Sequence, residues 1–145
     1  MDKLDDGILD LLRRNSRASY GEIGDRIGLS ASAVKRRVDR LVADGVIRSF
    51  TITVDPQVEG TATEAYVELF CRGTVAPQEL TRILQGVPEV VDAATVTGAA
   101  DAIVHLRSRD IASLEDALER LRIAPTVDHT RSAIVFSRLI HRTGT

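Results

Sequence analysis

The sequence is poor in aromatic residues, with no tryptophan, two tyrosines and three phenylalanines among its 145 residues. Proteins that bind single-stranded nucleic acids stack the bases on aromatic side chains, so this shortage argues against that class. The sequence also has no apolar run long enough to span a bilayer, and its N-terminus is acidic and amphipathic, unlike a signal peptide. We therefore expect a soluble, cytoplasmic protein with no membrane partner.

Cysteine is nearly absent as well. The single Cys71 excludes an internal disulfide framework and is typical of a reducing compartment. The three histidines, His105, His129 and His141, show no metal-ligand spacing with Cys71 or with one another. A site shared by His105 and His129, which could lie on neighbouring strands, is the one alternative, and we expect no metal and no cofactor.

Catalytic signatures are also missing. No nucleophile has a paired base, and the only close glycines, Gly21, Gly24 and Gly28, do not form a phosphate-binding loop. We expect that the protein is not an enzyme.

Charge is distributed unevenly along the chain. The net charge is −2, but residues 1–50 hold ten Lys/Arg against eight Asp/Glu, whereas residues 51–145 hold nine against thirteen. A basic N-terminal region followed by an acidic region is typical of proteins that bind nucleic acid through one part of the chain.

The basic part carries the signals of three short helices. Apolar spacing predicts helices over residues 4–14, 20–27 and from 31 onward, with Ser19 and Ser30 as N-caps. Gly28 ends the second helix, and a tight turn leads into the third. Helix, tight turn and helix in this order predict a helix-turn-helix.

The third helix separates its apolar and basic residues. Val34, Val38, Leu41 and Val42 share one stripe, whereas Ser32, Arg36 and Arg40 project away from it, with Lys35 and Arg37 on the flanks. Such a helix suits the major groove of double-stranded DNA, with Arg36 as the base reader and the flanking cations on phosphates. The alternative is a three-helix mini-domain whose basic face is only solvated. The expected DNA-binding residues are Ser30, Ser32, Lys35, Arg36, Arg37, Arg40, Arg17 and Arg26.

The second part of the chain changes to the two-residue period of strands. We expect strands over residues 46–54, 62–72, 90–96, 101–107 and 128–139, and helices over 77–84 and 111–121. The last four strands and two helices follow the order β-α-β-β-α-β, a ferredoxin-like sandwich. The expected domains are a winged-type helix-turn-helix over residues 1–50, a strand and hinge linker over 51–61, the βαββαβ domain over 62–139 and a tail over 140–145. The fold class is α+β.

One face of such a sheet is left uncovered by its helices. We interpret its residues as largely apolar and expect two sheets to pack face to face in a homodimer. A two-fold dimer also presents two recognition helices to two half-sites of DNA.

Several short motifs occur in order along nearly the whole chain. They are Asp5-x-x-Ile8-Leu9, Leu29-Ser30-x-Ser32-Ala33-Val34 with Arg36, Arg37 and Arg40, Gly45-Val46-Ile47, Thr97-Gly98-x-x-Asp101, and Thr130-Arg131-Ser132-x-Ile134-Val135. Together they resemble the Lrp/AsnC family, the feast/famine transcriptional regulators of bacteria and archaea. Members of this family pair through their C-terminal sheets and often assemble into tetramers or octamers.

The resemblance also implies a small-molecule effector, commonly an amino acid, bound at an interface near one turn. The corresponding residues are Thr97, Gly98, Ala99, Ala100 and Asp101, with Thr130 and Ser132 from the last strand. Exposed turn amides can hold a carboxylate, and Asp101 can take an ammonium. This turn departs from the family pattern, because alanines stand where acidic and aromatic residues are common, which implies a bulkier, more apolar effector or an empty site. The alternative is that Gly98 only makes a hairpin turn and Asp101 only accepts from nearby backbone amides.

Two other functions fit the same resemblance. One is a DNA-architectural protein of the same fold that needs no effector. The other is an enzyme similar to the siroheme decarboxylases, which share the architecture but do not need the basic helix that Arg36, Arg37 and Arg40 form here.

Overall fold

The computed structural model describes residues 1–140 and divides into two compact units, Met1–Thr53 and Val54–Leu139, with Ile140 grouped with the first. The expected tail therefore lies outside the described residues, apart from Ile140. Within residues 1–140 no helix has the length and apolar character needed to cross a bilayer.

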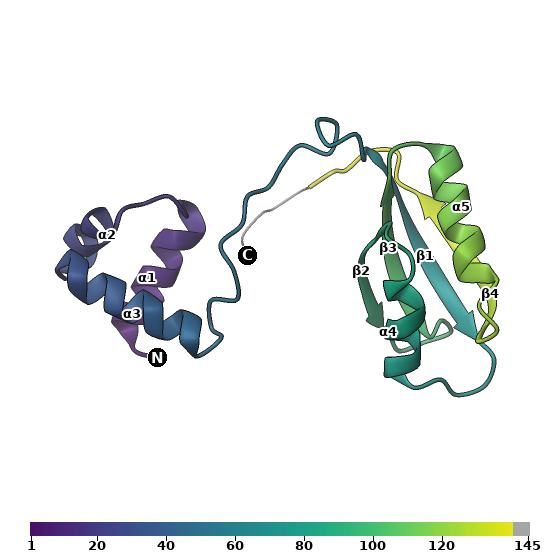
Figure 1. The fold of residues 1–145 in the computed structure, drawn as a ribbon, viewed down its shortest axis with the longest axis horizontal. Coiled ribbons are helices and arrows are strands. Elements are labelled where there is room, and N and C mark those ends of the chain that lie inside the picture. The colour runs from purple at the N-terminus through teal and green to yellow at the C-terminus, as the bar shows by residue number, and fades with distance from the viewer. Residues whose placement is uncertain (141–145) are drawn as a thin grey trace. The chain divides into compact units, whose positions relative to one another are not determined.

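The first unit consists of three helices, α1 (Lys3–Arg14), α2 (Tyr20–Ile27) and α3 (Ala31–Ala43), shown in purple and blue in Figure 1. All three begin at a side-chain cap, because the oxygens of Asp2, Ser19 and Ser30 accept from backbone N–H groups of the first turn. The helices enclose a small core of Ile8, Leu12, Ile23, Val34, Val38 and Leu41, all buried. The expected helices are confirmed, although Val42 is 46% exposed and lies outside this core.

The turn between α2 and α3 requires glycine at two positions. Gly28 caps α2 with φ of 74°, a left-handed conformation that favours glycine. At Gly24, a Cβ atom would lie 2.2 Å from the backbone oxygen of Leu29. The absence of a side chain at Gly24 therefore allows the chain to fold back closely onto α2 and fixes the start of α3.

The second unit is a four-stranded antiparallel sheet with two helices on one face (Figure 1). Its elements are β1 (Thr63–Cys71), α4 (Pro77–Gln85), β2 (Val90–Thr95), β3 (Ala102–Ser108), α5 (Ile111–Arg122) and β4 (Val127–Ile134). The strand order is β2-β3-β1-β4, which confirms the βαββαβ expectation and the α+β class. Leu80 and Leu84 of α4 and Leu114, Ala117 and Leu121 of α5 pack on the inward residues of β1 and β3.

Two expected strands are corrected. Residues 46–62 form no strand, because no neighbouring segment within the described chain supplies backbone partners for them. The last strand ends at Ile134 rather than near residue 139, since its partner β1 begins at Thr63 and only Val135 N–H, bonded to the carbonyl oxygen of Glu64, continues the pairing.

The face of the sheet opposite the helices is not largely apolar, which corrects the expectation. Alternation places charged and aromatic side chains there. They are Glu64, Tyr66, Glu68 and Phe70 of β1, Asp92 of β2, His105 and Arg107 of β3, and His129 and Arg131 of β4, and they lie beside the apolar Ala94, Ile103 and Ala133. The sheet therefore presents a mixed polar surface on this face.

Candidate DNA interface and ligand pocket

The helix-turn-helix brings five of the expected DNA-binding side chains to the exposed surface of α3 and its cap. They are Ser30, Ser32, Lys35, Arg36 and Arg40. The Ser30 oxygen accepts from the N–H of Ala33 and lies 3.1 Å from that of Ser32, so both hydroxyls stand at the N-terminus of the helix. A helix N-terminus with exposed hydroxyls favours contact with phosphate oxygens.

Arg36 is the cation on α3 best placed for a partner outside the chain. Lys35 donates to Asp39 one turn along at 2.6 Å, in an exposed pair of the kind that adds little stability. Within residues 1–140, by contrast, no carboxylate forms an ion pair with Arg36. Arg17 and Arg26 are also exposed and, in the same part of the chain, have no such pair.

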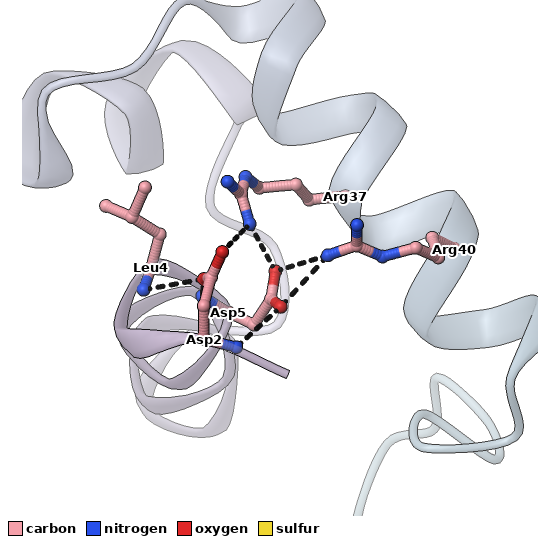
Figure 2. Close-up of polar contacts among 5 residues, drawn as sticks. All are labelled: Asp2, Leu4, Asp5, Arg37 and Arg40. Atoms are coloured by element: carbon pink, nitrogen blue, oxygen red, sulfur yellow. Dashed lines mark hydrogen bonds and ion pairs between the residues drawn. The ribbon is translucent and has the colours of Figure 1, made fainter.

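Arg37 and Arg40 are held by the start of α1 (Figure 2). The Asp5 side chain is 1% exposed and accepts from Arg37 Nη1 at 2.8 Å and from Arg40 Nη2 at 2.9 and 3.1 Å. Arg37 Nη1 also donates to Asp2 at 2.8 Å. We call Asp2, Asp5, Arg37 and Arg40 the α1–α3 clamp. It ties the third helix to the first through charge-assisted hydrogen bonds.

The clamp changes the expected roles of its two arginines and the acidity of its carboxyl groups. The Arg37 side chain is only 21% exposed, whereas that of Arg40 is 54% exposed and can still reach outward. The hydrogen bond from Arg37 lowers the pKa of Asp2 from its ordinary value to about 2. The same guanidinium is the main reason that the pKa of Asp5 is lowered. Both carboxylates are therefore charged at neutral pH. Their negative charges balance the positive charges of Arg37 and Arg40.

The expected effector turn lines a hollow in the second unit. Thr97, Ala99 and Ala100 border an open pocket of about 630 Å³ together with Glu68, Thr95, Val96 and Ile103. We call it the turn pocket. Gly98, with φ of 120°, shapes this connection between β2 and β3. Glu68 pairs with Ile103 in the strand register, so the pocket lies on the face of the sheet without helices.

Asp101 has a structural role at the same turn. Its Oδ2 atom accepts from the backbone N–H of Cys71 at 2.7 Å, and its own N–H donates to the carbonyl oxygen of Leu69 at 2.9 Å. These bonds attach the turn to β1 and agree with the alternative that Asp101 accepts from nearby backbone amides.

Thr130 and Ser132 do not lie with the turn within one chain. They pair with Leu69 and Val67, whose side chains face the helices, so their own side chains point to the helix-covered face of the edge strand β4. The Thr130 oxygen accepts from Arg122 Nε at 3.0 Å.

The two histidines within the described residues stack on aromatic side chains. His105 stacks on Tyr66 and His129 on Phe70, and β1 separates their strands, so they are not neighbours as the alternative required. His105 Nε2 also bonds to the buried Glu64 at 2.8 Å, and Arg138 pairs with the same carboxylate. Among the described residues, no group of three potential ligands could hold a metal ion.

Sequence reasoning missed the roles of Asp2, Asp5 and Glu68. Asp5 stands in the motif at the start of the chain, but its partners are 32 and 35 residues away. Glu68 could have been found from the two-residue period of β1, which places it on the same face as Tyr66.

Comparison with known proteins adds two family matches and close relatives. Residues 1–48 match the family described as winged helix-turn-helix DNA-binding, and residues 64–145 match the Lrp/AsnC ligand binding domain. The HTH-type transcriptional regulator Rv2324 of Mycobacterium tuberculosis is 50% identical over 98% of each chain. The structure of E. coli AsnC superposes with a TM-score of 0.90 at 26% identity, covering 99% of this chain and 97% of that one. The feast or famine regulatory protein Rv3291c of M. tuberculosis, solved with L-methionine, gives 0.87 at 29% identity over 97% and 95%.

Proposed function

The chain belongs to the Lrp/AsnC family of transcriptional regulators, and from this membership we propose that it binds specific DNA sequences and responds to an amino acid or a related metabolite. The observation that carries the proposal is the capped helix-turn-helix, which leaves Arg36 exposed and without an ion pair among residues 1–140. A ligand-binding domain on the same chain provides the response. Its relatives carry the names of transcriptional regulators rather than enzymes.

We assign the DNA contacts by the freedom of each side chain. Arg36 reads bases, because a free guanidinium can bond a guanine edge at two points. Lys35, Arg17 and Arg26 contact phosphates and place the helix. Ser30 and Ser32 add hydroxyl contacts to the DNA at the start of α3. The exposed part of the Arg40 side chain also contacts the DNA. Arg37 acts mainly by holding α3 to α1.

An amino-acid effector is supported by the relative solved with L-methionine and by the turn pocket on the same kind of domain. We propose Thr97, Gly98, Ala99 and Ala100 as its immediate surroundings, with Asp101 shaping the turn. Thr130 and Ser132 face away from this pocket in their own chain. We propose that they reach an effector only across an interface with another copy.

We propose a homodimer that assembles further into tetramers or octamers. The charged face of the sheet carries both signs, with Glu64 and Glu68 near Arg107 and Arg131. Two such faces related by a two-fold axis can pair opposite charges. The dimer then presents two copies of α3 to two half-sites of DNA.

Fluorescence anisotropy tests the function. The probe is the DNA upstream of the protein's own gene, measured against excess random DNA with and without a mixture of amino acids. We expect binding that survives the competitor and changes with the mixture. Binding that the competitor removes and no amino acid alters would instead support an effector-independent architectural protein of the same fold.

A further inference from the structure

The third helix carries four cations, and three of them have a carboxylate partner within the described residues. Lys35 pairs with Asp39, and Arg37 and Arg40 belong to the α1–α3 clamp. Arg36 is the one that has no ion pair among residues 1–140. The clamp consists of two arginines and two aspartates, so its formal charges cancel. The helix therefore presents less free positive charge to DNA than its sequence suggests.

The arginines of the clamp are held more firmly than a cation in a surface ion pair. Arg37 Nη1 lies 2.8 Å from an oxygen of Asp2 and 2.8 Å from an oxygen of the buried Asp5. Figure 2 shows the side chains of Arg37 and Arg40 extending from α3 toward the first turn of α1. Moving either guanidinium to a DNA phosphate would leave a buried carboxylate with fewer partners, which is unfavourable. The exposed Lys35–Asp39 pair, by contrast, separates at little cost.

The number of free cations on a recognition helix affects its specificity. Contacts between cations and DNA phosphates carry no sequence information, and they strengthen binding to random and specific DNA alike. Each such contact also makes the salt dependence of binding steeper by about one. Cations that stay bound to carboxylates of the protein therefore reduce nonspecific binding and leave base reading by Arg36 unchanged.

From these features we infer that Asp2 and Asp5 are specificity-determining residues. Their carboxylates keep Arg37, and part of Arg40, away from DNA phosphates, so that the preference for a sequence depends on Arg36. This inference rests on the proposed DNA-binding function and adds to it two acidic residues that act without touching DNA. A role in stability alone predicts the opposite effect of removing them, because a loosened third helix would bind every sequence more weakly.

The test is fluorescence anisotropy of the full-length protein on a random DNA duplex and on the DNA upstream of its own gene, at several salt concentrations. Asp2→Asn removes one negative charge but keeps a residue that caps helices as well as aspartate does, so α1 is retained. Asp2→Asn should bind the random duplex at least about twofold more tightly, with a steeper salt dependence, because Arg37 becomes available to phosphates. The ratio of specific to random affinity should fall. Asp5→Asn, measured at a temperature where circular dichroism shows it folded, should have the larger effect.

Two controls separate release of an arginine from a general change of charge. Asp6→Asn removes the same charge from the same turn of α1, at an exposed residue that has no ion pair among residues 1–140, and should tighten binding less. Asp2→Asn combined with Arg37→Gln removes both partners of one pair and should return the affinity for the random duplex to that of the wild type.

The failure of this inference differs from the failure of the proposed function. Binding of the random duplex by Asp2→Asn no tighter than by the wild type, or a gain no larger than that of Asp6→Asn, would overturn the inference and leave sequence-specific binding intact. Equal affinity of the wild type for the two duplexes would overturn sequence-specific binding, and the role of Asp2 and Asp5 in specificity with it.

Discussion

At the scale of single residues, the unusual group is Asp5. Its carboxylate is almost completely buried and forms ion pairs with two arginines of another helix. It accepts from Arg37 and Arg40 and also from the backbone N–H of Asp2 at 3.0 Å, so its lone pairs are well used. Removing one partner of a buried ion pair destabilises a protein strongly, because the remaining charge stays buried without a partner. Loss of the arginines or loss of the Asp5 charge would both have this effect. Asp5, in the first turn of α1, therefore also determines how the third helix is held.

Asp5→Asn tests this role, because asparagine keeps the shape but cannot share two negative oxygens between guanidinium groups. We expect a lower urea midpoint at pH 7 than in the wild type. The folded-state pKa of Asp5 is below its ordinary 3.8, so its stabilisation is full above that value and disappears as the pH falls through the lower folded-state pKa. The gap between variant and wild type should therefore close in acid. Asp10→Asn, which removes an exposed pair with Arg13, is the control and should change the midpoint little.

Arg36→Ala and Lys35→Ala separate reading of the sequence from attraction to the backbone. Arg36→Ala should cost about 1–3 kcal/mol of binding to the specific site and reduce the preference over random DNA. Lys35→Ala should weaken binding to all sequences alike and reduce the salt slope by about one. Anisotropy titrations at several salt concentrations on both kinds of DNA measure the two effects. Equal losses on specific and random DNA for both variants would contradict this division.

At the scale of elements, local sequence signals predicted the bounds of the helices well. Contacts between segments far apart in the sequence could not be predicted. The bounds of α2 follow from Ser19 and Gly28, which act on backbone groups within one turn, and the sequence shows both directly. The strand expected over residues 46–54 has the right composition, but a strand exists only with a partner, and no pattern along the chain reveals one. The residues of the candidate DNA interface show the same difference between local and long-range signals. The exposed Arg36 could be predicted from helical phase, whereas the hold of Asp5 on Arg37 depends on the packing of α1 against α3.

Gly24→Ala should destabilise the first unit at the α2–α3 turn. The new Cβ would lie 2.2 Å from the Leu29 carbonyl oxygen, a backbone atom that cannot move without shifting the start of α3. We expect a loss of about 1–3 kcal/mol or more, as for other overpacked sites. Gly21→Ala in the same helix meets only Ser19 Oγ at 3.9 Å and should be neutral or stabilise by about 0.5–1 kcal/mol. Chemical unfolding followed by circular dichroism compares the two, and an equal effect of both alanines would refute the close approach as the cause.

At the scale of the whole molecule, two segments outside the regular elements expose apolar side chains. Ile52 and Val58 are each 79% exposed, and Phe136 and Leu139 after β4 are almost fully exposed. Phe136 and Leu139 belong to one short segment after β4, and exposed apolar side chains that cluster in this way mark association surfaces in folded proteins. A second copy of the chain is the partner that the proposed dimer supplies.

Phe136→Asp should therefore shift the protein toward the monomer, because the carboxylate would have to lose its water in an interface. Sedimentation velocity at several concentrations measures the association state, and DNA affinity should fall with it as two-site binding is lost. Ile123→Asp, at the end of α5 and 74% exposed, introduces the same charge on the helix side of the sheet and should leave association unchanged. Sedimentation of Phe136→Asp identical to that of the wild type would exclude this segment from the interface.

The bond between Asp101 and Cys71 also bears on redox chemistry. Burial raises the pKa of the Cys71 thiol, and the neighbouring Asp101 carboxylate raises it further. Peroxides and alkylating agents attack the thiolate, so a thiol held in its protonated form reacts slowly with them. Because this is the only sulfhydryl in the sequence, we expect the arrangement that attaches the turn to β1 also to slow the reaction of the protein with peroxides and alkylating agents at cysteine.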